Sequence, residues 1–221
     1  MTQLLNRTNE EDFYNNWDLL LDSVKGKIQT HEKSIFEINI YIKPRDESEE
    51  KEREDWQIIA YETIGLNKIF RPVYLPYIKL ALLEEHPVLW KYKYDVLECE
   101  LSGTLENSHE FTSKLHWLYE KETGGFIKFE EDFYELKSFI NGRSKVRISI
   151  SIKTYSFVKS LIDNLGLEIR IVEVLTNENK GYLHRPDAKI LIFGNADVSS
   201  NYYNLGQPFV IADKFISKKK K

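Results

Sequence analysis

Polar side chains that could do chemistry flank a short apolar run near the carboxyl end of the chain. Three candidate catalytic residues precede the run: His184, Asp187 and Lys189. Five candidate ligand-binding residues follow it, and these are Asn195, Asp197, Ser199, Ser200 and Asn201. Lysine, serine and asparagine can hold an anion through hydrogen bonds, some of them charge-assisted, and a histidine or carboxylate can act as a nucleophile. The pattern therefore indicates a site for an anionic ligand.

The same loop also has a simpler interpretation. Glycine, asparagine, aspartate and serine are turn formers, so a polar loop after a buried strand needs no function. In open α/β sheets, however, ligands bind beyond the carboxyl ends of the strands, which is where this loop is expected. The sequence leaves open whether the loop is a site or only a turn.

In outline, this segment resembles the second half of a phospholipase D-like domain. That family has the motif H-x-K, four apolar residues, an aspartate, and then G-S-x-N before a final strand. Here Asp187-Ala188-Lys189 stands at the position of H-x-K, residues 190–193 match the apolar run, and Val198-Ser199-Ser200-Asn201 resembles G-S-x-N. Gly194 replaces the aspartate, and no histidine occupies the nucleophile position. The resemblance implies a catalytically inactive copy, with His184 as the first residue to examine as another nucleophile.

No other motif predicts a metal or cofactor site. The histidines are scattered, and there is no HExxH, Cys/His cluster, phosphate loop or G-x-G-x-x-G. Glu135 and Lys137 have the E-x-K spacing of metal-dependent nucleases, but their surroundings look helical. Residues 90–94 alternate aromatic rings with lysines, and on a strand the two kinds would face opposite sides. We therefore predict no metal and no cofactor, and buried rings beside solvated lysines.

The elements around the candidate site predict an α/β or α+β fold. Apolar and polar residues alternate over 145–153, which is typical of a strand with one polar side. Residues 154–165 have helical spacing with Thr154 as the cap, and 167–171 return to alternation. Such a strand–helix–strand most easily forms a parallel, right-handed unit. Residues 190–193 are apolar without alternation, which favours a strand inside the sheet, and residues 209–212 form a further strand.

The rest of the chain predicts a mixed, partly parallel sheet of about six strands with helices mainly on one face. The remaining expected elements are helices over 10–29, 78–85, 108–122 and 130–140, strands over 36–42 and 90–101, and an exposed acidic run over 46–55. We divide the chain into an N-terminal α+β region, 1–143, and a C-terminal βαβ-β-β unit, 144–217. The two are expected to form one compact domain.

Composition limits the classes of function. A hydrophobic fraction of 42% with 13% aromatic residues supports a core, and the net charge of -4 gives no general attraction to nucleic acid or anionic lipid. The single cysteine, Cys99, fits a reducing compartment. No run approaches the roughly 20 apolar residues that span a bilayer, and Met1 to Glu10 lacks a signal-peptide core. These observations predict a cytoplasmic protein with no membrane association.

The favoured function is a non-catalytic, cytosolic protein-binding or regulatory module whose partner is another protein or a second copy. The alternatives are a phosphodiesterase or nuclease-like enzyme, or its inactive relative, and a small-ligand sensor. Electrostatics separates these hypotheses, because an enzyme acting on nucleic acid should gather basic side chains on one face despite the negative net charge. The residues expected to form such a face are Lys145, Arg147, Lys153 and Lys189.

Overall fold

The computed structural model of the protein describes residues 1–30, 33–46, 52–67, 79–176, 178–179, 181–194 and 208–220, without the side chains of 27–30, 33 and 182. These residues divide into two compact units. Unit 1 consists of Met1–Glu85 and Asp187–Lys221, and unit 2 consists of His86–Pro186. The boundary that the sequence suggested, between residues 143 and 144, falls inside unit 2.

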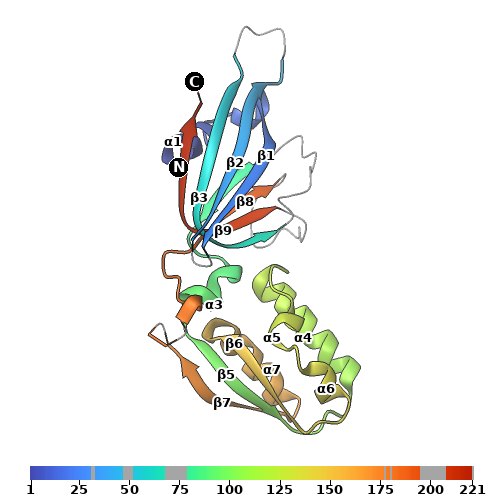
Figure 1. The fold of residues 1–221 in the computed structure, drawn as a ribbon. Coiled ribbons are helices and arrows are strands. Elements are labelled where there is room, and N and C mark those ends of the chain that lie inside the picture. The colour runs from blue at the N-terminus through green and yellow to red at the C-terminus, as the bar shows by residue number, and fades with distance from the viewer. Residues whose placement is uncertain are drawn as a thin grey trace. The chain divides into compact units, whose positions relative to one another are not determined.

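Unit 1 is built on a six-stranded antiparallel sheet that curls into a half-barrel (Figure 1). The strand order is β1-β2-β3-β9-β8-β4. The strands are β1 (Trp17–Thr30), β2 (Lys33–Pro44), β3 (Glu54–Asn67), β4 (Lys79–Leu83), β8 (Lys189–Gly194) and β9 (Phe209–Lys219). Two short helices, α1 (Thr2–Thr8) and α2 (Phe13–Asn16), precede β1. Residues from both ends of the chain therefore contribute to one sheet.

The core of unit 1 follows from the apolar pattern of its strands. The alternating residues Ile38, Ile40 and Ile42 of β2 are at most 1% exposed, and Leu4 of α1 joins the same cluster. Residues 190–193 of β8 are fully buried, and the strand pairs with β9 on one side and β4 on the other. The strand predictions for 36–42, 190–193 and 209–212 are thus confirmed.

The predicted acidic run reaches the sheet at Glu54. Residues 47–51 lie outside the described residues, and Glu52 is exposed. The Glu54 carboxylate is only 15% exposed, and it accepts hydrogen bonds from Arg7 Nε at 3.1 Å and Trp56 Nε1 at 3.2 Å. Lys219 Nζ lies 3.2 Å from it. Desolvation alone would raise the pKa of Glu54, but hydrogen bonds from Lys219, Arg7 and Trp56 outweigh it and lower the pKa.

We expect Glu54→Gln to lower the free energy of unfolding by about 1–2 kcal/mol at pH 7, because the charge-assisted hydrogen bonds are lost. Glu52→Gln, on an exposed residue, should change it by less than about 0.5 kcal/mol. A depressed folded-state pKa means that the Glu54 contribution is present above the ordinary value of 4.5 and is lost as pH falls through the folded pKa. Urea unfolding at pH 7 and in acid measures both effects. Equal stability of the two variants at pH 7 would contradict the assignment.

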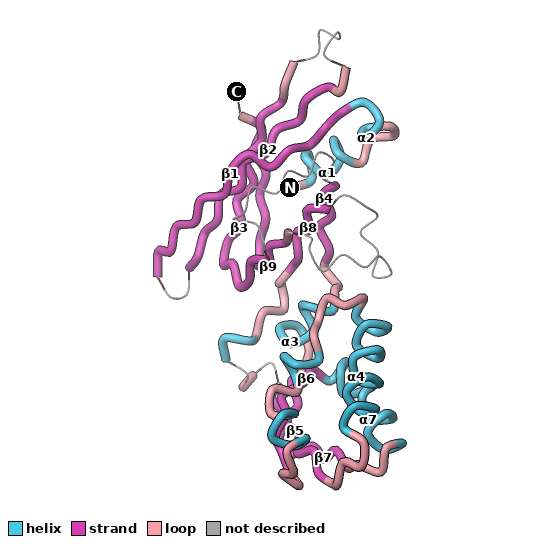
Figure 2. Tube along the Cα trace, turned by 90° about the vertical axis from the view of Figure 1, so that its right-hand side faces the viewer, coloured by secondary structure: helices cyan, strands magenta, loops and turns pink. Residues whose placement is uncertain are grey.

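Unit 2 combines a three-stranded antiparallel sheet with helices on one face of that sheet (Figures 1 and 2). The central strand β5 (Val96–Ser102) pairs with β6 (Lys145–Ser151) on one side and with β7 (Glu168–Leu175) on the other. The helices are α3 (Trp90–Lys93), α4 (Ser108–Thr123), α5 (Phe129–Asp132), α6 (Leu136–Ile140) and α7 (Ile152–Asn164), with 3-10 turns η1 (Pro87–Leu89) and η2 (Gly181–Leu183).

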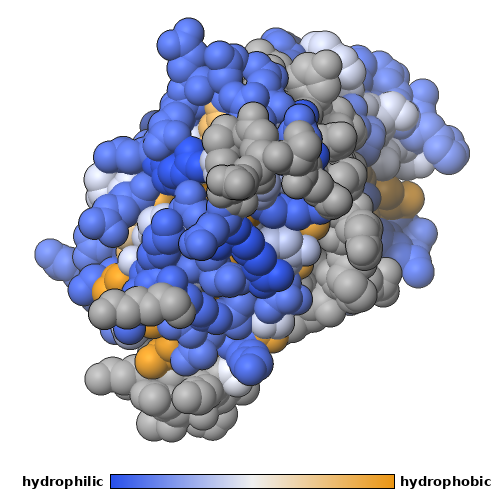
Figure 3. Space-filling view, turned by 90° about the horizontal axis from the view of Figure 1, so that it is seen from above, coloured by the Kyte–Doolittle hydropathy of each residue, from blue (hydrophilic) through white to orange (hydrophobic). Residues whose placement is uncertain are grey.

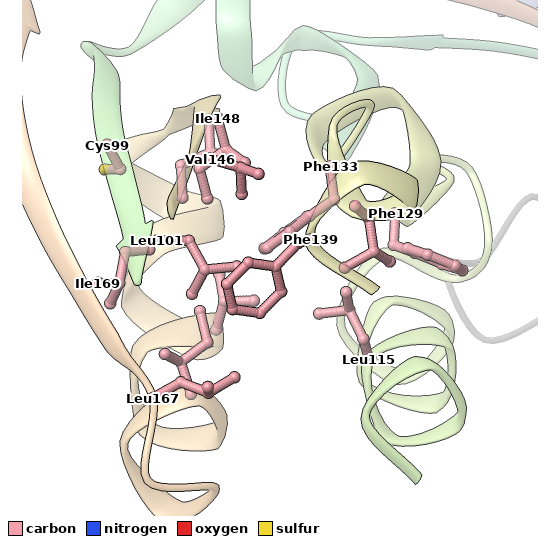
Figure 4. Close-up of a cluster of buried hydrophobic side chains, with 14 of the residues drawn as sticks. Cys99, Leu101, Leu115, Phe129, Phe133, Phe139, Val146, Ile148, Leu167 and Ile169 are labelled. Atoms are coloured by element: carbon pink, nitrogen blue, oxygen red, sulfur yellow. The ribbon is translucent and has the colours of Figure 1, made fainter. Parts of the chain in front are cut away.

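The core of unit 2 lies between the sheet and its helices (Figure 4). Buried residues of β5 and β6, together with Ile169 of β7, belong to one cluster with the aromatic rings of Phe129, Phe133 and Phe139 and with Leu115 of α4. Helix α4 begins after Asn107, whose side chain accepts a hydrogen bond from Glu110 N–H, and it ends at Gly124 with a φ of 61°. Helix α7 is capped by Ser151, whose Oγ accepts a hydrogen bond from Thr154 N–H, and not by Thr154 itself.

The predicted fold class is wrong. The strand pairs are antiparallel in both sheets, whereas one mixed, partly parallel sheet with helices mainly on one face was expected. Strands β6 and β7 do run in the same direction and are joined by α7, but β5 lies between them and is antiparallel to both. Strands β8 and β9, expected in the same sheet, belong to unit 1. The sequence pattern of β6, α7 and β7 contains no information that β5, which comes earlier in the chain, lies between β6 and β7 in the sheet.

Three local predictions also fail. Most of the expected helix 10–29 is strand β1, the expected helix 78–85 contains β4, and residues 90–93 are helical and not extended. Strand β1 pairs with β2 along nearly its full length. Cross-strand pairing with a distant segment has therefore decided the conformation over a weak helical periodicity. The helix at 108–122 is confirmed, and 130–140 contains two short helices with a break between them.

His86 is buried where the chain enters unit 2. It is 7% exposed, and its ring packs edge-on against Phe126 with the ring centroids 4.4 Å apart. Its Nδ1 accepts a hydrogen bond from Val88 N–H at 3.4 Å. Burial lowers the pKa of His86 to about 4 from its ordinary value of 6.5. The neutral imidazole is therefore the form that the folded chain accommodates.

We expect this histidine to make stability fall as pH drops from about 6.5 to about 4. Above that range the ring is neutral in both states, and within it the unfolded chain binds a proton that the folded chain does not. A difference of one pKa unit is worth about 1.4 kcal/mol, so the loss due to His86 is about 3 kcal/mol. His86→Asn keeps an acceptor for Val88 N–H but cannot titrate. Between pH 6.5 and pH 4, the free energy of unfolding of this variant should therefore fall by about 3 kcal/mol less than that of the wild-type chain. Identical pH profiles for the two proteins would contradict the account.

Candidate functional site

The residues singled out from the sequence are divided between the two units. Lys189 begins β8 and Asp187 lies two residues before it, both in unit 1, whereas His184 belongs to unit 2. The Nδ1 atom of His184 is buried and has no hydrogen-bond partner within the described part of the chain. The five predicted ligand-binding residues, Asn195, Asp197, Ser199, Ser200 and Asn201, lie outside the described residues.

Asp187 and Lys189 line an open pocket of about 950 Å³ in unit 1. Its walls come from α1, β3, β4, β8, β9 and the residues that adjoin them. The charged side chains of the lining are the carboxylates Glu62, Glu84, Asp187 and Asp213 and the ammonium groups of Lys189 and Lys214. Lys189 forms an ion pair with Glu84. Since acidic side chains outnumber basic ones, this lining does not favour the anion predicted at Lys189.

The expected basic face is not formed within either unit by the described residues. Lys145 and Arg147 lie on the open face of the unit 2 sheet together with the acidic residue Glu100, which pairs with Arg147 across the strands. The Oε1 atom of Glu100 lies 3.1 Å from Lys145 Nζ. Lys153 lies on α7, with its Nζ 4.6 Å from the centre of the Tyr94 ring, and Lys189 belongs to unit 1. The open face of this sheet therefore carries charges of both signs.

Other reactive groups offer no site among the described residues. No group of three or more histidine, cysteine, aspartate or glutamate side chains in that part of the chain could hold a metal ion. Cys99 is 1% exposed, and burial raises the pKa of its thiol to about 11. None of the described helices has the length and apolar character needed to cross a membrane.

Within the described part of the chain, exposed apolar side chains gather on the outer strand β7 of the unit 2 sheet. We call residues 168–175 the β7 edge. In the described structure β7 has β5 on one side only, so it ends the sheet (Figure 1). Six of its residues are exposed, and three of these are large and apolar: Ile171 at 41%, Val172 at 48% and Val174 at 41%. An edge strand that exposes apolar side chains beside unpaired backbone groups is a template for a further strand.

This exposure is not general. Among the residues of the outer strand β1 in unit 1 whose side chains the structure describes, none is an exposed large hydrophobic residue, and the exposed ones include Asp22 and Lys25. On the face of the molecule drawn in Figure 3, hydrophobic residues form only small, separate areas within a mostly hydrophilic surface. Charged and polar edges resist pairing with other strands, so β1 and β7 differ in this respect.

The β7 edge contains an irregularity that the sequence could have revealed. Glu98 of β5 pairs with Glu173, and Cys99 pairs with Ile171, so Val172 is an extra residue in a β-bulge. In the sequence, the alternating apolar residues Ile169 and Ile171 change parity to Val172 and Val174. The strand predicted from the alternation over 167–171 does not include this bulge. Bulges re-aim side chains at the edges of sheets.

Comparison of the chain with models of known protein families, with curated proteins and with solved structures found no match.

Proposed function

We propose that this protein is a protein-binding module that takes an extended segment of its partner along the β7 edge. The observation that carries the proposal is the concentration of exposed apolar side chains, Ile171, Val172 and Val174, on an unpaired outer strand. Adding a strand to a sheet edge is a recurrent mode of peptide recognition. It needs no catalytic group, which agrees with the binding role predicted from the sequence.

The chemistry of the edge defines the partner segment. Main-chain hydrogen bonds to the outward N–H and C=O groups of β7 would supply affinity, and they accept an extended segment of any sequence. Covering the three apolar side chains would add about 1 kcal/mol each, because each is already half-buried. Arg170 and Glu173 on the same strand would select the charge of the residues opposite them. The expected partner is therefore an extended, valine-rich or isoleucine-rich segment with a carboxylate facing Arg170 and a cation facing Glu173.

A designed peptide tests this proposal on the full chain. The labelled peptide alternates valine with polar residues and places one glutamate opposite Arg170 and one lysine opposite Glu173. We expect Val172→Lys/Val174→Lys to raise the Kd for this peptide at least tenfold in fluorescence anisotropy, and exchange of the two peptide charges to weaken binding as well.

Ile152→Lys provides the matched control. Ile152 is also an exposed apolar residue of unit 2, at 44%, but it begins α7 and does not lie on the β7 edge. This variant should bind the peptide within twofold of wild type. Equal loss in both variants, or no binding by the wild-type chain at a concentration at which it is monomeric, would overturn the proposed function.

A further inference from the structure

We infer that the strand which pairs with the β7 edge is β7 of a second copy of this chain. The inference rests on the proposed function, since it names the partner of the same edge. Its basis is that the sequence of β7 is complementary to itself in one antiparallel register. In that register Glu168 faces Leu175, Ile169 faces Val174, Arg170 faces Glu173 and Ile171 faces Val172 of the second copy. Each Arg170 then meets a Glu173, so two pairs of opposite charge form around the two-fold axis.

The bulge is what makes this register possible. In an antiparallel pair, residues directly opposite each other point to the same side of the sheet. In a regular strand, residues three positions apart point to opposite sides, so Arg170 and Glu173 could not face each other across a two-fold axis. Here Arg170 pairs with Glu100 of β5, and Glu173 pairs with Glu98. Both therefore lie on the open face, because Val172 is the extra residue between them.

The apolar residues agree with the same register. Ile169 pairs with Leu101 and Val174 pairs with Leu97, and both residues of β5 are buried against the helices. Ile169 and Val174 thus lie on the helix-covered face and would meet each other there across the seam. A register shifted so that Arg170 faced Arg170 of the second copy would place like charges in contact. Of these two registers, the one with two Arg–Glu pairs therefore places complementary residues opposite each other at 170/173 on the open face and at 169/174 on the helix-covered face.

The resulting assembly joins two three-stranded sheets into one continuous sheet in the order β6-β5-β7-β7-β5-β6. It would cover the exposed side chains of Ile171, Val172 and Val174 in each copy. Because the seam is a single strand of eight residues on each side, its area is below the roughly 800 Å² per partner of standard interfaces. We therefore expect a reversible dimer whose population depends on protein concentration.

Charge reversal tests the register in the full chain. Arg170→Glu and Glu173→Arg each place like charges opposite one another twice, so each should raise the dimer Kd at least tenfold in sedimentation equilibrium. The double variant Arg170→Glu/Glu173→Arg restores two opposite-charge pairs and should return the Kd to within about threefold of wild type. Arg170 Nη2 also lies 3.2 Å from Glu100 Oε1 in the same chain. Because the Arg170 side chain is exposed, loss of this ion pair should change the free energy of unfolding little. Thermal unfolding of all three variants checks this point.

The outcomes separate this inference from the proposed function. A chain that stays monomeric over the whole dilution series but binds the designed peptide would overturn the second copy as partner and keep the strand-binding function. A chain that neither dimerises nor binds the peptide would overturn both. A dimer that the single charge reversals do not weaken, or that the double variant does not restore, would overturn this register and the inference with it.

Discussion

Leu191→Asp is expected to remove more than about 5 kcal/mol from the free energy of unfolding, enough to abolish the fold of unit 1. Leu191 is fully buried in β8, where it pairs with Val210 of β9 and Leu82 of β4. Loss of a buried leucine costs about 2–5 kcal/mol, and burial of a carboxyl group without a partner adds several more. The total approaches the whole stability of an ordinary domain, about 5–15 kcal/mol.

Circular dichroism and urea unfolding measure this effect. Leu191→Met, which keeps the volume and apolar character of the site, should cost less than about 1.5 kcal/mol and serves as the control. A Leu191→Asp variant as stable as wild type would mean that β8 is not the buried strand described above. It would also contradict the strand order of the unit 1 sheet, since β8 lies between β9 and β4 in that sheet.

Asp132→Ala is expected to destabilise unit 2 by about 3–4 kcal/mol. The Asp132 carboxylate is 1% exposed, and it receives a hydrogen bond from the Tyr119 hydroxyl at 2.8 Å and lies 2.5 Å from Lys91 Nζ. These three residues join α3, α4 and α5. Burial, with the adjacent Asp132 carboxylate, raises the pKa of Tyr119 well above its ordinary value, so its hydroxyl remains a donor. Alanine would leave this buried hydroxyl without its partner and would create a small cavity.

A double-mutant cycle isolates the interaction. Tyr119→Phe alone should cost about 1–3 kcal/mol, because it removes a hydrogen bond to a buried charge. With Asp132→Ala already present, Tyr119→Phe should cost clearly less, since the hydroxyl no longer has a partner. Additive losses in the two single variants and the double variant would show that Tyr119 and Asp132 are not coupled.

The sequence predicted those elements whose pattern is strong and local. The strand at 145–151 and the helix after it were recognisable because their apolar periods are regular and the helix has a capping residue at its start. The run at 190–193 was recognised as a buried strand because it is apolar at every position. The partners of these strands depend on pairs far apart in the sequence, such as β3 with β9 and β4 with β8. No local pattern contains that information, so the sheet topology was predicted wrongly.

The site was missed for a related reason. Polar residues beside a buried strand drew attention to Asp187 and Lys189, which share a pocket but sit among carboxylates. The residues that distinguish the β7 edge are isoleucine and valine, which are common in any strand. They form a candidate binding surface only because their side chains are exposed. Exposure depends on which strand ends the sheet, and that was not predictable before the order β6-β5-β7 was known. Only the parity change at Val172 was visible beforehand.

Amide hydrogen exchange of the full chain with and without the designed peptide tests the central claim most directly. The experiment is run at a protein concentration at which the chain is monomeric. If β7 accepts a further strand, the outward amides of residues 168–175 should exchange at least tenfold more slowly when the peptide is saturating, while the amides of the outer strand β1 keep their rates. Unchanged exchange over 168–175 with the peptide bound, or protection that maps to other elements, would contradict the assignment of the β7 edge as the binding surface.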